Sequence, residues 1–543
     1  MNRFKSFIMY LVALAATAVL LVGVGISSGR LNQLVKTHHL RATGDIKNAP
    51  PIVTFTTVAL GSFRGLLADL LWLRALALQD EGNYFEMVQL ASWITKLQPR
   101  FSGATAFLAW NMAYNISVTC SSPEERWRWI SRGIELLRDE AIEYNPEEAS
   151  LYKELAWIYQ HKIGNIMDDA NLYYKRQVAE SMEKVFGGAP PDWKVWAETP
   201  SSNDKFLARL TPDDRKVLER ALDDSGYTLG SLETSFRQND RLPEEFLAKY
   251  QVSAEEISRL VTFLRVNWLV NVYKIDPRLV LQINNKYGAL DWRLPESYAI
   301  YWATKGLEMT PSHKDDNCER VVTQALHDAF VSGRLLMVDP TNNNNIITAP
   351  NLNVIDALRA AYIKAYKEDD TDSFRSALIN FTKEAVVVFY NFGQYSKAEH
   401  YYKLLQKEDP GKKEYRAGME AFVLKEWEEF VQQASLRQAN EIIGGLLFRS
   451  CNFLAEGDVD AALGQEQMAR KIYLRYMKRH VRTKGRVGLA DYNQMKARIT
   501  ESCLKNFPPL LSRSLRLQLE QEKLRAQEEM AEQKKQEEAA AGK

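Results

Sequence analysis

Residues 393–410 read GQYSKAEHYYKLLQKEDP, and this stretch decides the fold. A glycine opens it, a tyrosine follows two residues on, an alanine three further, a second aromatic residue four further, and a proline closes it. These positions are Gly393, Tyr395, Ala398, Tyr402 and Pro410. Glycine and proline bound helices, whereas the residues between them here favour helix. The stretch therefore predicts one helix of a repeated helical unit.

Two further stretches repeat part of this pattern. Residues 81–99 read EGNYFEMVQLASWITKLQP, which has a methionine, Met87, where the alanine is expected. Residues 456–469 read EGDVDAALGQEQMA, which has Val459 in place of the aromatic residue and no closing proline. The pattern thus occurs near both ends of the chain.

A separate repetition links residues near the N-terminal copy. Pro99 and Pro146 lie 47 residues apart, and nine residues beyond each stands Leu-Ala-Trp, ending at Trp110 and Trp157. A looser copy, Leu-Leu-Trp, ends at Trp72, 38 residues before Trp110. Repeats of about 34 to 47 residues are typical of arrays of helix hairpins, in which each hairpin buries one face on its neighbour.

The pattern resembles the tetratricopeptide repeat family, whose unit has the glycine, aromatic residue, alanine and proline at these spacings. The resemblance covers residues 60–175 and 374–480, whereas residues 190–370 look helical but lack the motif. It implies an all-α fold, an α-solenoid of helix hairpins. Together with the N-terminal transmembrane helix that residues 6–29 predict, this gives an anchored helical array. The family binds peptides and proteins in a concave groove that the first helix of each hairpin lines.

Four aromatic side chains are the candidate binding residues. The resemblance would direct Trp110 and Trp157 towards the groove, with Tyr114 and His161 one helical turn further on. Packing between hairpins would explain the same rings equally well, since stacked hairpins need broad apolar contacts. We therefore predict a protein or peptide site at these four residues, with core packing as the alternative.

Composition supports helices and argues against nucleic acid as a partner. The 543 residues carry 70 Lys and Arg against 69 Asp and Glu, so the chain lacks the basic excess of most nucleic-acid-binding proteins. Glycine (27) and proline (18) are scarce for a chain of this length, which favours helices over a β-sandwich. The four cysteines lie far apart without a CxxC motif, so neither a zinc site nor a disulfide framework is indicated.

The N-terminus predicts a membrane anchor. Residues 6–29 carry no charge, and as a helix they would rise about 36 Å, enough to span a bilayer. A cleaved signal peptide is the alternative, but its apolar region is usually shorter. The short tail before this segment favours a single-pass protein of a bacterial inner membrane with a periplasmic body, although the flanking positive charges are nearly balanced.

The chain divides by composition into an anchor, a linker, two repeat regions and two regions of other character. Residues 192–240 and 339–352 look like loops or loosely packed surface, and residues 53–58 form the only convincing β-branched run. From residue 513 the chain is densely charged, which indicates a solvated helix or tail. The expected regions are 1–29 (anchor), 30–59 (linker), 60–189 (repeats), 190–373 (helical, with long insertions), 374–480 (repeats) and 481–543 (helix and charged tail).

Signatures of catalysis and metal binding are missing. The sequence has no GxxxxGK, GxGxxG, HExxH or GxSxG motif. His313, Asp315, Asp316 and Cys318 are close in sequence, but accidental crowding in a loop explains them better than a metal site does. We expect no enzyme activity, no metal and no small-molecule cofactor.

These observations predict a membrane-anchored scaffold or adaptor that binds other proteins, for example in secretion or envelope assembly. The alternative is a cell-wall or glycan hydrolase built on a helical array, because two catalytic carboxylates can lie in unrelated helices without a local motif. Two convergent acids of raised pKa in a deep pocket would favour the hydrolase, whereas a long open groove would favour binding.

Overall fold

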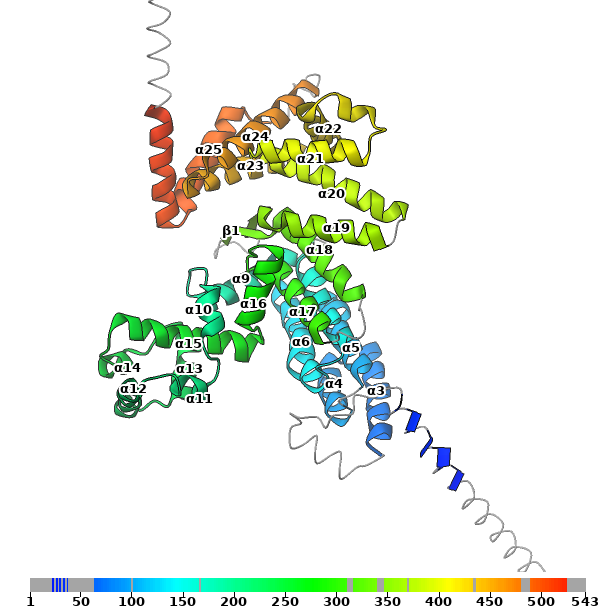
Figure 1. Cartoon of the computed structure of the whole chain (residues 1–543), viewed down its shortest axis with the longest axis vertical. Coiled ribbons are helices and arrows are strands. Elements are labelled where there is room, and N and C mark those ends of the chain that lie inside the picture. The colour runs from blue at the N-terminus through cyan, green and yellow to red at the C-terminus, as the bar shows by residue number, and fades with distance from the viewer. Residues whose placement is uncertain are drawn as a thin grey trace, which may run out of the picture. The chain divides into compact units, whose positions relative to one another are not determined.

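The computed structural model describes residues 63–98, 101–165, 168–309, 316–338, 346–368, 371–432, 436–479 and 489–524, with scattered positions between 22 and 37. These residues are largely helical, and neighbouring helices pack as antiparallel pairs, which confirms the all-α prediction (Figure 1). The chain forms two compact units. The first comprises residues 1–155 with 305–315, and the second comprises residues 156–304 with 316–543.

The first unit is a set of antiparallel helices that contain two π-helical segments. The elements are α3 (Phe63–Glu81), α4 (Tyr84–Leu97), α5 (Ser102–Trp110), η1 (Asn111–Ile116), η2 (Ser117–Thr119), α6 (Pro123–Glu135), η3 (Leu136–Ala141), α7 (Ile142–Tyr144) and most of α8 (Ala149–Trp157). Helix α3 packs on α4, α4 on α5, and α5 on α6. The core between them includes Leu78, Met87, Ile94, Leu108 and Ile130, all fully or almost fully buried.

The second unit begins with another π segment and a group of helices of varied length. The elements are η4 (Ile158–Ile163), α9 (Asn171–Phe186), α10 (Trp193–Glu198), α11 (Asn203–Leu207), α12 (Pro212–Ser225), α13 (Leu229–Asn239), α14 (Glu244–Lys249), α15 (Ala254–Tyr273), α16 (Pro277–Tyr287), most of α17 (Pro295–Met309) and α18 (Asp316–Ser332). The loops expected over residues 192–240 are therefore wrong. Short helices form there because spaced apolar side chains, among them Trp196, Phe206 and Phe236, are buried.

A two-stranded antiparallel sheet follows α18. Strand β1 (Arg334–Val338) pairs with β2 (Ile346–Ala349), with a register irregularity between Leu335 and Met337. This strand pair differs from the loop or loosely packed surface expected over residues 339–352. The expected β-branched run, residues 53–58, lies outside the described residues.

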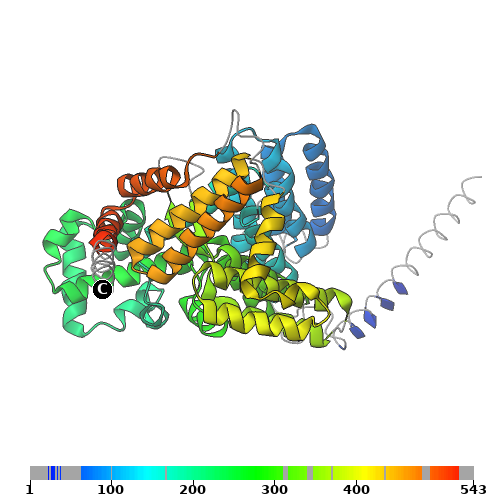
Figure 2. The same ribbon diagram turned by 90° about the horizontal axis from the view of Figure 1, so that it is seen from above.

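The rest of the second unit consists of longer helix hairpins. The elements are η5 (Leu352–Val354), α19 (Ile355–Glu368), α20 (Asp372–Asn391), α21 (Tyr395–Glu408), η6 (Lys413–Arg416), α22 (Met419–Gln432), α23 (Leu436–Glu456), α24 (Val459–Arg479) and α25 (Tyr492–Asn506). Helices α20 with α21 and α23 with α24 lie side by side as antiparallel pairs (Figure 2). Residues 509–524 form a further helix, whose Leu515 is buried in the core cluster beside Phe507 and Cys503. Leu524, at its end, is exposed.

The motif glycines occupy the same turn in three hairpins. Gly82 follows α3, Gly393 follows α20 and Gly457 follows α23, and each has a positive φ, between 68° and 85°. In each turn the glycine N–H bonds to the carbonyl three residues back, and the next N–H bonds to the carbonyl five residues back. This is the Schellman ending, which glycine adopts without steric cost. Five residues after each glycine, the small or flexible motif position (Met87, Ala398 or Ala462) is buried.

Side-chain caps begin several of these helices. Ser122 and Thr211 cap α6 and α12 with proline at the first position, and Ser253 with Glu256 forms the capping box of α15.

No helix among the described residues is both apolar enough and long enough to cross a bilayer. The anchor predicted at residues 6–29 lies almost wholly outside the described residues.

Candidate functional site

The first expected aromatic pair forms at the junction of α5 and η1. Trp110 is the last residue of α5, and its ring stacks on that of Tyr114 at 5.4 Å and 22°. Trp110 is 37% exposed and Tyr114 is half-buried. Burial, and then the charge of Glu154, raises the pKa of Tyr114, so its hydroxyl stays protonated at neutral pH.

The second pair forms in the same way at the junction of α8 and η4. The ring of Trp157 stacks on His161 at 4.7 Å and 10°, and both residues are half-buried. Burial, with a smaller contribution from Lys162, lowers the pKa of His161. The imidazole is therefore mostly neutral at pH 7.

The two copies of Leu-Ala-Trp thus share a structure that sequence analysis did not predict. In both, the α-helix ends at the tryptophan and a six-residue π segment begins at the next residue. Such segments are rare and are frequent at functional sites. Each pair stacks within its own helix, and the two pairs belong to different compact units. The shared binding groove implied by the resemblance stays a prediction.

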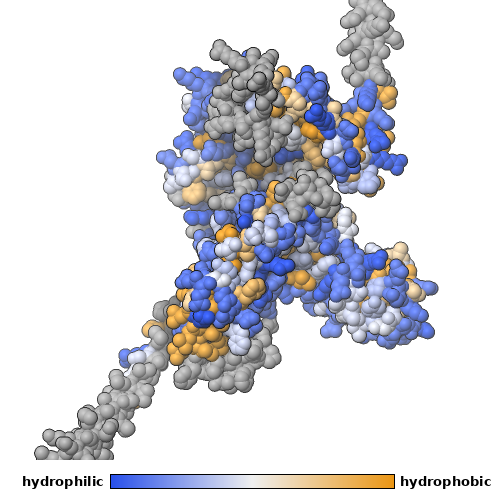
Figure 3. All heavy atoms as spheres, turned by 180° about the vertical axis from the view of Figure 1, so that it is seen from behind, coloured by the Kyte–Doolittle hydropathy of each residue, from blue (hydrophilic) through white to orange (hydrophobic). Residues whose placement is uncertain are grey.

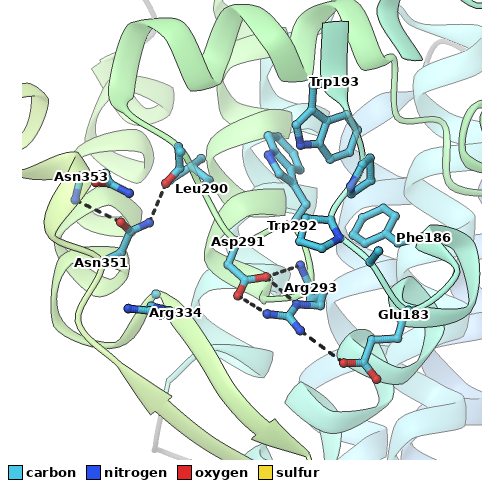
Figure 4. A pocket seen from close by; sticks show the side chains of 16 residues that line it. Glu183, Phe186, Trp193, Leu290, Asp291, Trp292, Arg293, Arg334, Asn351 and Asn353 are labelled. Carbon is cyan, nitrogen blue, oxygen red and sulfur yellow. Dashed lines mark hydrogen bonds and ion pairs between the residues drawn. The ribbon is translucent and has the colours of Figure 1, made fainter. Parts of the chain in front are cut away.

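The second unit also contains a cavity of about 260 Å³ that the sequence did not reveal. One wall is aromatic: Trp193 lies 5.7 Å from Phe186 and 5.8 Å from Trp292, ring centre to ring centre, in edge-to-face contacts (Figure 4). The turn after α9, with Pro190 and Pro191, contributes to the same lining. Sequence separation explains why the cavity was missed, since its lining comes from residues 183–193, 289–293, 333–334 and 351–353.

The same cavity is also lined by charged side chains that are already ion-paired. The guanidinium of Arg293 donates to both carboxylate oxygens of Asp291, at 2.9 and 2.8 Å, and lies 3.3 Å from Glu183 (Figure 4). Burial opposes the charge of Arg293, but these carboxylates raise its pKa. Asp291 also accepts the backbone N–H of Leu335 at 2.9 Å. The two acids are held by one cation, an arrangement suited to orienting a polar ligand rather than to moving protons.

A larger hollow, of about 660 Å³, lies over α18, α19, α20 and α22. His327 and Glu384 face each other there, with Nε2 and Oε2 2.7 Å apart. The hydrogen bond to Glu384 raises the pKa of His327, although burial opposes this shift. Tyr362 and Trp427 add aromatic surface to the same hollow.

Acids of raised pKa lie elsewhere: burial raises the pKa of Glu233 on α13, and two more such acids, Glu296 and Asp328, lie on α17 and α18. Burial raises the pKa of Glu296 and of Asp328, despite the lowering effect of Lys175 on Glu296 and of Gln160 on Asp328. The Lys175 ammonium lies 3.9 Å from Glu296, and the Gln160 amide donates to Asp328 at 3.2 Å. None of these three acids lines either hollow described above. Within the described ranges, no group of three or more His, Cys, Asp or Glu residues could hold a metal ion.

Neither a scan against models of known protein families nor a search of curated protein sequences finds a match for this chain. The fold and the sites therefore identify a largely helical protein of many packed helices, with no family assigned.

Proposed function

We propose that this chain is a membrane-anchored helical-repeat protein that binds other proteins and acts as a scaffold or adaptor. The observation that carries the proposal is the repeated stack at Trp110–Tyr114 and Trp157–His161, each beside a π segment. A half-exposed tryptophan held rigidly by a neighbouring ring suits a protein interface, where large aromatic anchors supply much of the binding energy.

The repeat assignment is part of this proposal. Three hairpins end their first helix at a glycine of positive φ and bury the motif position five residues later. This arrangement supports a tetratricopeptide-like solenoid at residues 60–189 and 374–480. It leaves the intervening region as an adapted part of the array.

The location is proposed from the sequence. The uncharged residues 6–29 would hold the protein in a bacterial inner membrane, with the body on the periplasmic side. A body tethered in this way meets its partners at the membrane surface, where the local concentration of membrane proteins is high.

The hydrolase alternative has less support. Its expected feature is a pair of acids with raised pKa converging in a pocket, and the acids of raised pKa described above line neither hollow. The acids that do line the smaller cavity, Glu183 and Asp291, share the cation of Arg293.

A photocrosslinking amino acid placed at position 110 of the full chain tests the proposal. Crosslinking in native membranes should give a discrete adduct with another protein, and Tyr114→Ala should weaken it because Tyr114 no longer stacks on the aromatic crosslinker that replaces Trp110. The matched control is position 93, since Trp93 lies in the same unit and is 57% exposed. A common set of adducts at both positions, or none at position 110, would refute the binding site.

A further inference from the structure

Helix α3 is apolar on two opposite faces. Ala68, Ala75 and Leu78 are buried on the side that packs within the first unit. On the other side, Leu66, Leu70 and Leu73 are 58%, 55% and 62% exposed. A hydrophobic patch appears over the N-terminal helices at the lower left of Figure 3. A contiguous row of exposed leucines on one helix face marks an interaction site, so the outer face of α3 calls for a partner.

The spacing of this outer face is that of a coiled-coil seam. Leu66, Leu70, Leu73 and Ala77 follow one another at intervals of four, three and four residues. This is the alternation of a and d positions, with leucines 66 and 73 at d and residues 70 and 77 at a. The seam therefore fits another α-helix of the same spacing.

The charged residues beside the seam determine the orientation in which a second α3 helix can pair with it. Asp69 precedes an a position and Arg74 follows a d position, so they occupy g and e. Arg74 lies five positions after Asp69. This is the offset at which a g residue of one helix meets an e residue of the other helix in a parallel pair. In an antiparallel pair of the same helices, aspartate would face aspartate and arginine would face arginine.

We propose that α3 pairs in parallel with α3 of a second copy of this chain. Asp69 then faces Arg74 of the partner subunit, and the pairing is reciprocal, as a two-fold axis requires. Arg74 now contacts Glu81 at 3.2 Å and Glu86 at 3.5 Å, but these are exposed ion pairs and cost little to rearrange. Charge complementarity and a shared seam thus select a homodimer as the occupant of this face.

The orientation of the chains agrees with a parallel homodimer, and the length of α3 limits the affinity of that dimer. In a parallel pair both chains enter α3 at the same end of the seam, which suits the proposed membrane anchor at residues 6–29 of each chain. The nineteen residues of α3 offer about two heptads. So short an interface gives a dimer that dissociates on dilution, although packing on α4 already holds each helix folded.

Charge reversal tests the pairing in the full chain, purified in detergent and measured by sedimentation over a range of concentrations. Asp69→Arg and Arg74→Asp should each weaken dimerisation by roughly tenfold, because each variant sets two like charges against each other. The double variant should recover most of the loss, since the pair is re-formed with its signs exchanged. Asp223→Arg, on the exposed surface of α12, is the matched control and should change nothing.

Cysteine crosslinking tests the orientation. In parallel helices, Leu66→Cys crosslinks with itself and Leu73→Cys with itself, above the background of the four native cysteines. A mixture of the two variants should give little of the mixed product. A chain that stays monomeric at every concentration, a preference for the mixed product, or a dimer indifferent to both charge reversals would each overturn the proposal. Leu70→Lys that releases the protein from lipid without changing its oligomeric state would assign this face to the membrane instead.

Discussion

Replacing Gly393 by alanine should loosen the packing of α24 on the α20–α21 turn. The residue has φ of +68°, and a Cβ added there would lie 2.5 Å from the backbone oxygen of Asp460. A left-handed conformation costs a residue with a side chain about 1–2 kcal/mol. The clash is with backbone rather than with a flexible side chain, so α24 must shift, at a further cost of about 1–3 kcal/mol. We expect a total loss of about 2–5 kcal/mol in local stability.

Substitutions at two other glycines measure separately the cost of the positive φ and the cost of the close contact. Gly457 has φ of +85° with nothing within 4 Å of an added Cβ, so Gly457→Ala should show only the backbone cost, about 1–2 kcal/mol. At Gly464 no positive φ is involved, but an added Cβ would lie 2.6 Å from the nitrogen of Gly393. Gly464→Ala should therefore show the contact cost alone, about 1–3 kcal/mol.

Hydrogen exchange with mass spectrometry is the assay, because a chain of two units need not unfold in one step. Amides of α20, α21 and α24 should exchange roughly 30-fold faster or more in Gly393→Ala, and about 5- to 30-fold faster around the α23–α24 turn in Gly457→Ala. Equal effects of these two substitutions, or a silent Gly464→Ala, would refute the close approach of α24 to the α20–α21 turn.

The remaining predictions concern two ion pairs. His327 has a raised folded-state pKa because of Glu384, so the stability it contributes is complete below the unfolded value near 6.5 and is lost as pH rises through the folded value. Amide hydrogen exchange in α18 and α20 should therefore become faster as pH rises through the folded-state pKa of His327. Glu384→Gln should remove most of this pH dependence. An exchange rate that does not change with pH, after correction for intrinsic exchange, would contradict the prediction. Lys162 and Asp168 form a buried pair at 2.5 Å, so Lys162→Met should cost about 3–5 kcal/mol by removing the ammonium that faces the buried carboxylate. Burial alone would raise the pKa of Asp168, but its hydrogen bonds lower it, so a titration of local stability should show this contribution disappearing as pH falls through the folded value.

Local signals in the sequence predicted local structure well. Caps such as those of Ser122, Thr211 and Ser253 can be recognised in a sequence, because a cap needs only side chains and N–H groups within three residues. The turn at Gly393 is correct for a similar reason, since a positive φ is a property of one residue. Such features are readable because their physical cause lies inside a short window.

Features that depend on distant residues were missed. The strand pair β1–β2 encloses residues 339–345, and nothing in either strand alone distinguishes it from a short apolar helix or loop. The cavity beside Trp193 joins four separate segments, and the only local signal was the aromatic and charged cluster at Asp291-Trp292-Arg293. Residues 192–240 were misread because polar composition hid the spacing of buried side chains such as Phe236.

The π segments have a consequence for the history of this chain. Each adds residues to a helix without adding a full turn of rise, so it resets the angular phase of everything that follows. An α-helical residue turns the chain by about 100°, and a deletion of one residue within 111–116 would therefore rotate the downstream face, including Ile116, away from its neighbours. Conversely, a helix that gains one residue can absorb it in a π turn and keep both ends in place. Repeats that contain such turns can therefore differ in length while their buried faces keep the same angular position. A search for a repeat of fixed length does not detect them.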